Sequence, residues 1–221
     1  MEESLAIATR TGDLWGAGHA LMSLGSINRF AKNYQAAIDY FTRSLETILK
    51  IGDRRDEGIV NSNLALLHFV NGDHQKSGEC AERSFAVFQA MGNEFQSPYP
   101  LRMMGYSAVH AGNVVRARVL IGESLRGNYA IADTLGQLAC VIGMAYCDLA
   151  EKEHKSAVRL CALAETQRQQ RNLQFLEPDA IVGGDIQKQC KKKMGKAAYE
   201  TAYHEGQKSN LDNIVMQLMA G

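Results

Sequence analysis

A repeat with a period of forty residues is the feature that most restricts how this chain can fold. The stretch SLAIATRTGD near the start returns as SLETILKIGD and then as SFAVFQAMGN. Four columns of the sequence keep this spacing: Ser4, Ser44, Ser84 and Ser124; Gly12, Gly52, Gly92 and Ala132; Leu24-Gly25, Leu64-Ala65, Met104-Gly105 and Met144-Ala145; and Ala37, Ser77, Ala117 and Ala157. A fixed period of this size indicates an array of small units, each packing on its neighbours.

Each unit is predicted to be a hairpin of two helices. In the first unit, residues recur at steps of three and four, which is the spacing of one helix face. One such stripe comprises Leu14, Ala17, Leu21, Leu24 and Asn28, and a second comprises Tyr34, Ala37, Ile38, Phe41, Leu45 and Ile48. The short polar stretch AKN separates the stripes, so the helices must run antiparallel. The glycine and aspartate that end the units predict a left-handed helix stop and a cap for the next helix.

The first unit carries a pattern that resembles the tetratricopeptide repeat (TPR). Its residues are Leu21, Leu24-Gly25, Tyr34, Ala37 and Phe41. The unit is longer than the usual ~34 residues, and the proline that normally closes a TPR unit is missing. Longer units of this kind are similar to the C-terminal repeats of bacterial signal-transduction ATPases and of LuxR-type or AfsR-type regulators. The segment that follows the repeats in those proteins is similar to residues 194–215, with Gly195, Tyr199, Tyr203, Gly206 and Leu211 in the matching places.

The resemblance implies an all-α fold, a right-handed α-α superhelix of about four helical hairpins with a helical cap. We expect repeats over residues 1–171 and a capping segment over 172–221. Within the repeats we expect a partial leading helix at 1–11 and units at 13–50, 53–90, 93–131 and 133–171. The leading helix corresponds to the latter part of a unit. Either the chain is a piece of a longer protein, or its front face packs against something else.

The third unit departs from the others because Pro98 and Pro100 stand where the other copies continue as helix. Proline is tolerated in the first turn of a helix and breaks a helix interior. We therefore expect this helix to begin late, with Ser97 as its cap and residues 94–96 as a loop. The loop is either an entrance for a ligand or an ordinary packing adjustment.

The composition indicates a soluble protein without a global charge preference. Lysine plus arginine and aspartate plus glutamate both number 24, so no overall field favours nucleic acid or an anionic membrane. The longest apolar runs are too short to span a membrane, and the first residues lack a signal-peptide pattern. The 5 cysteines are unevenly spaced within apolar stretches, which is typical of reduced, buried thiols. We expect a cytoplasmic protein.

The chain carries no motif of an enzyme. It contains no GxxxxGK[ST] phosphate loop, no HExxH and no GxSxG, and its 6 histidines are scattered. The lysines between 188 and 196 form a basic stretch that fits a solvated helix face better than a phosphate site. We therefore expect no catalytic residue, no metal and no cofactor.

The family resemblance places the first helices of successive units on an inner, concave wall that binds partners. The positions carried over to this wall are His19, Met22, Arg29, Ile59, Ser62, Phe69, Tyr99, Arg102, Tyr106, His110 and Tyr146. They vary from unit to unit, and they mix aromatic, arginine and apolar side chains, as recognition surfaces do. An arginine on such a wall can hold a carboxylate by two hydrogen bonds, which favours Arg29 and Arg102.

These observations predict a scaffold or sensor module that binds a protein or peptide in its groove. The resemblance implies the regulatory part of a bacterial signalling or transcription-regulating protein, without direct contact to nucleic acid or membrane. The alternative is a structural module that self-associates as a homodimer through the leading helix.

Overall fold

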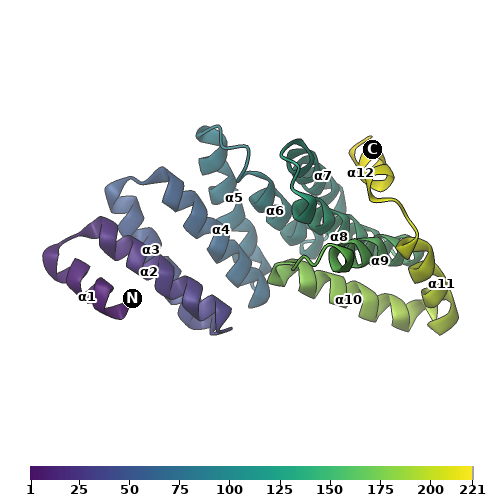
Figure 1. Ribbon diagram of the computed structural model, residues 1–221, viewed down its shortest axis with the longest axis horizontal. Helices are drawn as coiled ribbons and strands as arrows, with labels where there is room; N and C mark the ends of the chain where they lie inside the picture. The colour runs from purple at the N-terminus through teal and green to yellow at the C-terminus, as the bar shows by residue number, and fades with distance from the viewer. Residues whose placement is uncertain (221) are drawn as a thin grey trace. The chain divides into compact units, whose positions relative to one another are not determined.

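The computed structural model describes residues 1–220, and all regular secondary structure within that range is helical, which confirms the predicted all-α class (Figure 1). The helices are α1 (Glu2–Thr11), α2 (Leu14–Phe30), α3 (Tyr34–Ile51), α4 (Arg54–Val70), α5 (His74–Ala90), α6 (Pro98–His110), α7 (Val114–Ala130), α8 (Thr134–Ala150), α9 (His154–Gln170), α10 (Glu177–Met194), α11 (Lys196–Gln207) and α12 (Leu211–Ala220).

The chain divides into two compact units, Met1–Asn93 and Glu94–Gly221. Unit 1 holds α1 to α5, and unit 2 holds α6 to α12. The tail that we predicted as a capping segment lies in the same compact unit as α6 to α9. Two prolines in its first turn make α6 start late and shorten it to 13 residues, as predicted. Ser97 is the N-cap residue, but its side chain makes no capping hydrogen bond, contrary to our expectation.

A residue with positive φ recurs every twenty positions, at the turn between successive helices. These residues are Gly12, Lys32, Gly52, Gly72, Gly92, Gly112, Ala132, Lys152 and Asn172, with φ between 53° and 83°. The left-handed backbone turns the following N–H groups back onto the last carbonyls of the helix. After α4, for example, the Gly72 N–H donates to the Phe69 carbonyl at 3.0 Å and the Asp73 N–H to the His68 carbonyl at 2.8 Å. The predicted left-handed stops at Gly12, Gly52 and Gly92 are confirmed.

Aspartates after these stops cap the first helix of three hairpins. The side chains of Asp13, Asp53 and Asp133 accept hydrogen bonds from backbone N–H groups three residues later, at 2.9, 3.1 and 3.1 Å. Each bond satisfies one of the N–H groups that have no partner inside the helix. The predicted cap at the end of each of these units is therefore confirmed.

Within each hairpin the two helices approach closely at small residues. A Cβ added at Gly25 would lie 2.8 Å from the Phe41 ring, and one at Gly105 would lie 2.5 Å from the Ile121 side chain. The recurring serines form hydrogen bonds between the same two helices. The hydroxyls of Ser44, Ser84 and Ser124 donate to the carbonyls of Gly18, Gly58 and Pro98, each 26 residues earlier, at 2.9, 2.9 and 2.6 Å. The serine column therefore ties the second helix to the first in three successive hairpins.

The tail helices pack on the last two hairpins of unit 2. Helix α10 lies alongside α8 and α9, α11 packs on α9, and α12 reaches α7 and α9 (Figure 1). Helix α10 begins at Glu177-Pro178 and continues through Gly183-Gly184 to Met194.

Two glycines of unit 2 lie in different backbone conformations, so we predict that substitution by alanine changes stability in opposite directions at the two positions. Gly112 has a φ of 77° whereas Gly184 lies inside α10, and an added Cβ meets nothing within 4 Å at either position. Gly112→Ala should lower the free energy of unfolding by about 1 kcal/mol, because a Cβ disfavours the left-handed region. Gly184→Ala should raise it by about 0.5–1 kcal/mol through helix propensity. Urea denaturation followed by circular dichroism measures both, and shifts of the same sign would contradict this account.

Candidate functional site

In unit 1, one face of α2 exposes large aromatic side chains. Trp15 is 60% exposed and Phe30 is 73% exposed, and both lie on the same helix stripe as His19, Met22 and Arg29. We call this stripe, together with Asp56 and Ile59 of α4, the α2–α4 surface. Aromatic residues are enriched at protein interfaces, so this face is a candidate for binding.

Contacts within the α2–α4 surface hold these aromatic groups in place. The Trp15 and His19 rings are tilted against each other with centroids 4.1 Å apart. His19 Nε2 lies 3.0 Å from Asp56 Oδ2, which joins α2 to the buried Asp56 side chain of α4. The Arg29 guanidinium lies 4.4 Å from the centroid of the Phe30 ring, within cation–π distance. The surface therefore offers aromatic faces and a cation held on rigid helices.

Two of the predicted wall residues of unit 1 do not contribute to an open surface. Phe69 is only 3% exposed and packs edge to face on His74, with centroids 4.8 Å apart. The Ser62 hydroxyl lies 2.7 Å from the Ser84 hydroxyl, so it points into its own hairpin. Both positions serve packing, because they lie on the side of α4 that turns toward α5.

In unit 2 the structure brings all five predicted residues together on α6 and α8. The Arg102 guanidinium lies 5.2 Å from the centroid of the Tyr99 ring. The Tyr106 and Tyr146 rings meet edge to face with centroids 6.2 Å apart, and the Tyr146 hydroxyl lies 2.9 Å from His110 Nε2. We call this row the α6–α8 face.

The centre of the α6–α8 face is closed by α10, which corrects the expectation that Arg102 and Tyr106 line an open groove. Arg102 Nε and Nη2 donate to Asp179 Oδ1 and Oδ2 at 3.0 and 3.2 Å. The Tyr106 hydroxyl donates to Asp179 Oδ1 at 2.8 Å and lies 3.2 Å from the Ala139 carbonyl. Arg102, Tyr106 and Asp179 are 4%, 0% and 2% exposed. Arg102 thus holds a carboxylate by two hydrogen bonds, but the carboxylate belongs to the same chain.

The electrostatics of this cluster follow from its burial. Burial alone would lower the pKa of the Arg102 guanidinium, but the charge of Asp179 raises it, so the arginine stays charged. Burial, and after it the charge of Asp179, raises the pKa of Tyr106 well above its ordinary value, so the phenol stays a hydrogen-bond donor. Burial, followed by the charge of Asp185, raises the pKa of Tyr146 to about 12.

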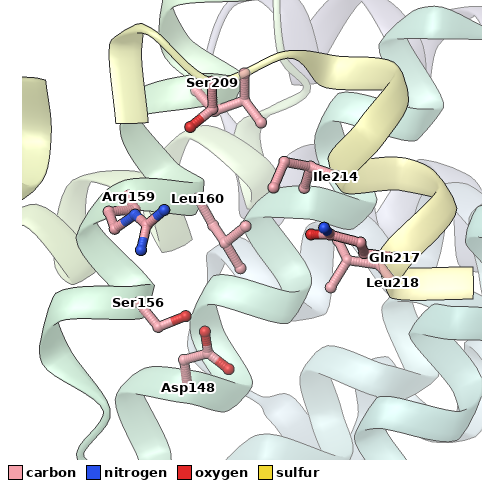
Figure 2. A pocket seen from close by; sticks show the side chains of 9 residues that line it. Asp148, Ser156, Arg159, Leu160, Ser209, Ile214, Gln217 and Leu218 are labelled. Atoms are coloured by element: carbon pink, nitrogen blue, oxygen red, sulfur yellow. The ribbon is translucent and has the colours of Figure 1, made fainter. Parts of the chain in front are cut away.

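The tail leaves two cavities in unit 2. One, of about 280 Å³, lies between α8, α9 and α12, and Figure 2 shows Asp148 and Ser156 at one end and Ile214, Gln217 and Leu218 of α12 on the opposite wall. A second, of about 270 Å³, lies against α7 and shares Gln217 and Leu218. Asp148 of the first cavity is paired with Arg118 of α7 at 2.6 Å.

The possible metal ligands and the thiols are dispersed over residues 1–220. That part of the chain has no group of three or more His, Cys, Asp or Glu placed to hold a metal ion. All five cysteines are buried and free. Burial raises the pKa of Cys147 and of Cys161 to about 12, so these thiols stay protonated and are poor nucleophiles. No helix within the described range is long and apolar enough to cross a membrane.

The sequence analysis did not single out Trp15, Phe30 or Asp179. Trp15 and Phe30 share a helix stripe with His19, Met22 and Arg29, so their spacing was a usable signal, although their exposure was not visible in the sequence. Asp179 lies 77 residues after Arg102 and outside the repeats, so no periodicity pointed to it.

Comparisons with known proteins identify the fold. No family model matches the sequence, and no curated protein matches it either. Among solved structures, the chain is similar to the crystal structure of nearly identical TPR-like repeats of a putative kinesin light chain from Podosopora anserina, with a TM-score of 0.57, 15% identity and coverage of 91% of this chain and 94% of that one. A form of the same protein with one substitution gives a TM-score of 0.58 at the same identity and coverage.

The chain therefore has the fold of a TPR-like repeat solenoid, as predicted. The likeness at 15% identity concerns the fold alone.

The buried pair generates a stability prediction. Asp179→Ala should lower the free energy of unfolding by about 3–5 kcal/mol, because it leaves the Arg102 charge buried without a partner. Replacing both charges, as in Arg102→Met with Asp179→Leu, should recover most of that loss. Asp185→Ala, an exposed aspartate on the same helix, is the matched control and should change stability by less than about 0.5 kcal/mol. Equal effects of the two aspartate substitutions in urea denaturation would refute the role of the pair.

Proposed function

We propose that the chain is a protein- or peptide-binding module whose open site is the α2–α4 surface of unit 1. The observation that supports this most directly is the exposure of Trp15 and Phe30, at 60% and 73%, on one stripe of a well-packed helix. Binding would bury these aromatic rings, and a few buried aromatic side chains often supply most of the binding energy of a protein interface. His19 and Arg29 hold the rings in position, so little side-chain freedom would be lost on binding.

The partner that fits this surface is a segment with apolar side chains and an acidic group. The aromatic rings would take the apolar side chains, and the positive charge of Arg29 would favour an acidic group beside them. Met22 and Ile59, both half-buried, would form the floor between α2 and α4. Recognition, without chemical conversion of the partner, is the proposed mechanism.

We further propose that the module acts in the cytoplasm as the regulatory or sensing part of a bacterial signalling or transcription-regulating protein. What supports this setting is the length of the repeat and the resemblance of residues 194–215 to the segment that follows the repeats in such regulators. The balance of 24 basic and 24 acidic residues supports a protein partner over nucleic acid or an anionic membrane.

Selection of peptides from a random displayed library on the full chain tests the proposed site. Trp15→Ala should weaken the selected peptides by about 30-fold, as expected when an interface hot spot is truncated, and Phe30→Ala should act in the same direction. Leu49→Ala is the matched control, because Leu49 is 54% exposed on α3, outside the α2–α4 surface, and it should leave affinity unchanged. Fluorescence anisotropy measures all three. Equal loss in the Leu49 variant, or none in the Trp15 variant, would exclude the site.

Self-association through the leading helix is the second candidate, because Ile7 of α1 is 47% exposed. A homodimer that buries this side chain should be lost in Ile7→Asp and kept in Leu49→Asp. Light scattering coupled to size-exclusion chromatography measures the mass of each variant. A monomeric unsubstituted chain at high micromolar concentration would rule out this function.

A further inference from the structure

We propose that the α6–α8 face of unit 2 is a second binding site, selective for a helix that begins with an aspartate, and that α10 is its built-in occupant. A partner segment of the same chemistry would bind there by replacing α10. This inference concerns residues other than those of the α2–α4 surface and stands independently of the proposed function.

The donors of the site belong to the repeat framework and not to the tail. Arg102 and Tyr106 lie one helical turn apart on α6, so their side chains reach the same place. Together they supply three hydrogen bonds to one carboxylate, at 2.8, 3.0 and 3.2 Å. The Tyr99 ring beside the guanidinium, at 5.2 Å, supports its position. The receptor half of the contact is therefore complete on a single helix.

The choice of a charged contact at this place indicates selectivity. A buried ion pair gives little net stability, because removing both charges from water costs about as much as their attraction returns. Apolar side chains of similar volume would hold α10 at least as well. What the pair adds is rejection of any segment without a carboxylate, since such a segment would leave Arg102 buried and unpaired.

The occupant presents a short and definable pattern. Its buried residues on α10 are Pro178, Asp179, Val182, Gly183, Ile186 and Cys190, which follow one another at helical spacing. Pro178 and Asp179 stand in the first turn of the helix, where a proline and a carboxylate are both favoured. A partner helix would need the same order: an aspartate in its first turn, then small and branched aliphatic residues at steps of three and four.

Helix α10 is also suited to leave the site. A linker without regular helix, residues 173–176, joins it to the preceding turn. To leave, α10 must give up the hydrogen bonds that join Gly183 and Gln187 to Cys161 of α9, and the Arg168 bond to the Leu173 carbonyl at 2.9 Å can keep the linker on α9. Gly183 and Gly184 stand in its middle, and each has a lower helix propensity than alanine. When it is not docked, α10 would not remain a stable helix. The free energy of docking must therefore offset the conformational entropy that is lost when the helix forms. A partner competes against this tethered segment, whose effective concentration is on the order of millimolar.

The test uses the full chain, opened by Asp179→Ala with Ile186→Asp, and a fluorescent peptide spanning Gln174–Met194. Ile186 is fully buried, so an aspartate there should displace α10. We expect the peptide to bind the opened chain at least about tenfold more tightly than the unsubstituted chain, where α10 competes at high effective concentration. The same peptide with Asp179→Asn, and the opened chain with Arg102→Met, should each lose about tenfold or more in affinity. Fluorescence anisotropy measures all four combinations.

Equal binding of the two peptides, or no binding of either to a folded opened chain, would overturn the proposal. Circular dichroism establishes that the opened chain is folded. If it is not, hydrogen exchange on the unsubstituted chain decides the question: excess Gln174–Met194 peptide should accelerate exchange of the α10 amides about tenfold or more, and the Asp179→Asn peptide should not. Unchanged exchange with both peptides would equally overturn it. Neither outcome depends on Trp15 or Phe30, so failure here is distinguishable from failure of the α2–α4 surface.

Discussion

A left-handed residue every twenty positions is the constraint on which the rest of the structure depends. It stops most helices after 17 or 18 residues and reverses the chain, so a given position of each hairpin meets the same neighbour. The serine of the second helix therefore finds the same carbonyl of the first helix in three hairpins. The small residues recur for the same reason, since the two helices of each hairpin approach at one level. The regular spacing also determines which side chains remain exposed to solvent, so both the fold and the surface follow from it.

Much of the fold could be predicted because glycine, proline and serine mark backbone requirements directly. Gly12 and Gly52 predict the left-handed turns that the structure shows, and Pro98 predicts the late start of α6. Lys32 and Lys152 occupy equivalent turns without a glycine, with φ of 61° and 67°, and no residue type signalled them. The forty-residue repeat could therefore be read from the sequence, but the left-handed turns midway through some of its units could not. Turn geometry imposed by the neighbouring helices overrides the residue preference at those positions.

The candidate sites were harder to predict, because helical spacing gives the face of a side chain but not what covers that face. Arg102 was singled out for its ability to hold a carboxylate, which it does, yet the carboxylate comes from a tail that does not share the repeat. Phe69 was placed on the same wall by its position in the repeat and lies buried against His74. Trp15 was not singled out from the sequence, and its 60% exposure is visible only in the structure. Long-range contacts of a non-repeating segment are the part that a periodic sequence does not encode.

The two units differ in how their first helices meet the solvent, and this difference bears on function. In unit 1 the aromatic residues Trp15 and Phe30 lie in water, which costs free energy unless a partner covers them. In unit 2 the corresponding face already holds a helix, locked by the Arg102–Asp179 pair with 4% and 2% exposure. The same repeat thus supports an open apolar surface in unit 1 and, in unit 2, a face closed by a buried ion pair. A buried pair adds little net stability, but it is costly to break from one side, so it disfavours a segment that lacks the carboxylate. The presence of that pair is the physical reason to regard α10 as a bound segment and not only as the end of a stack.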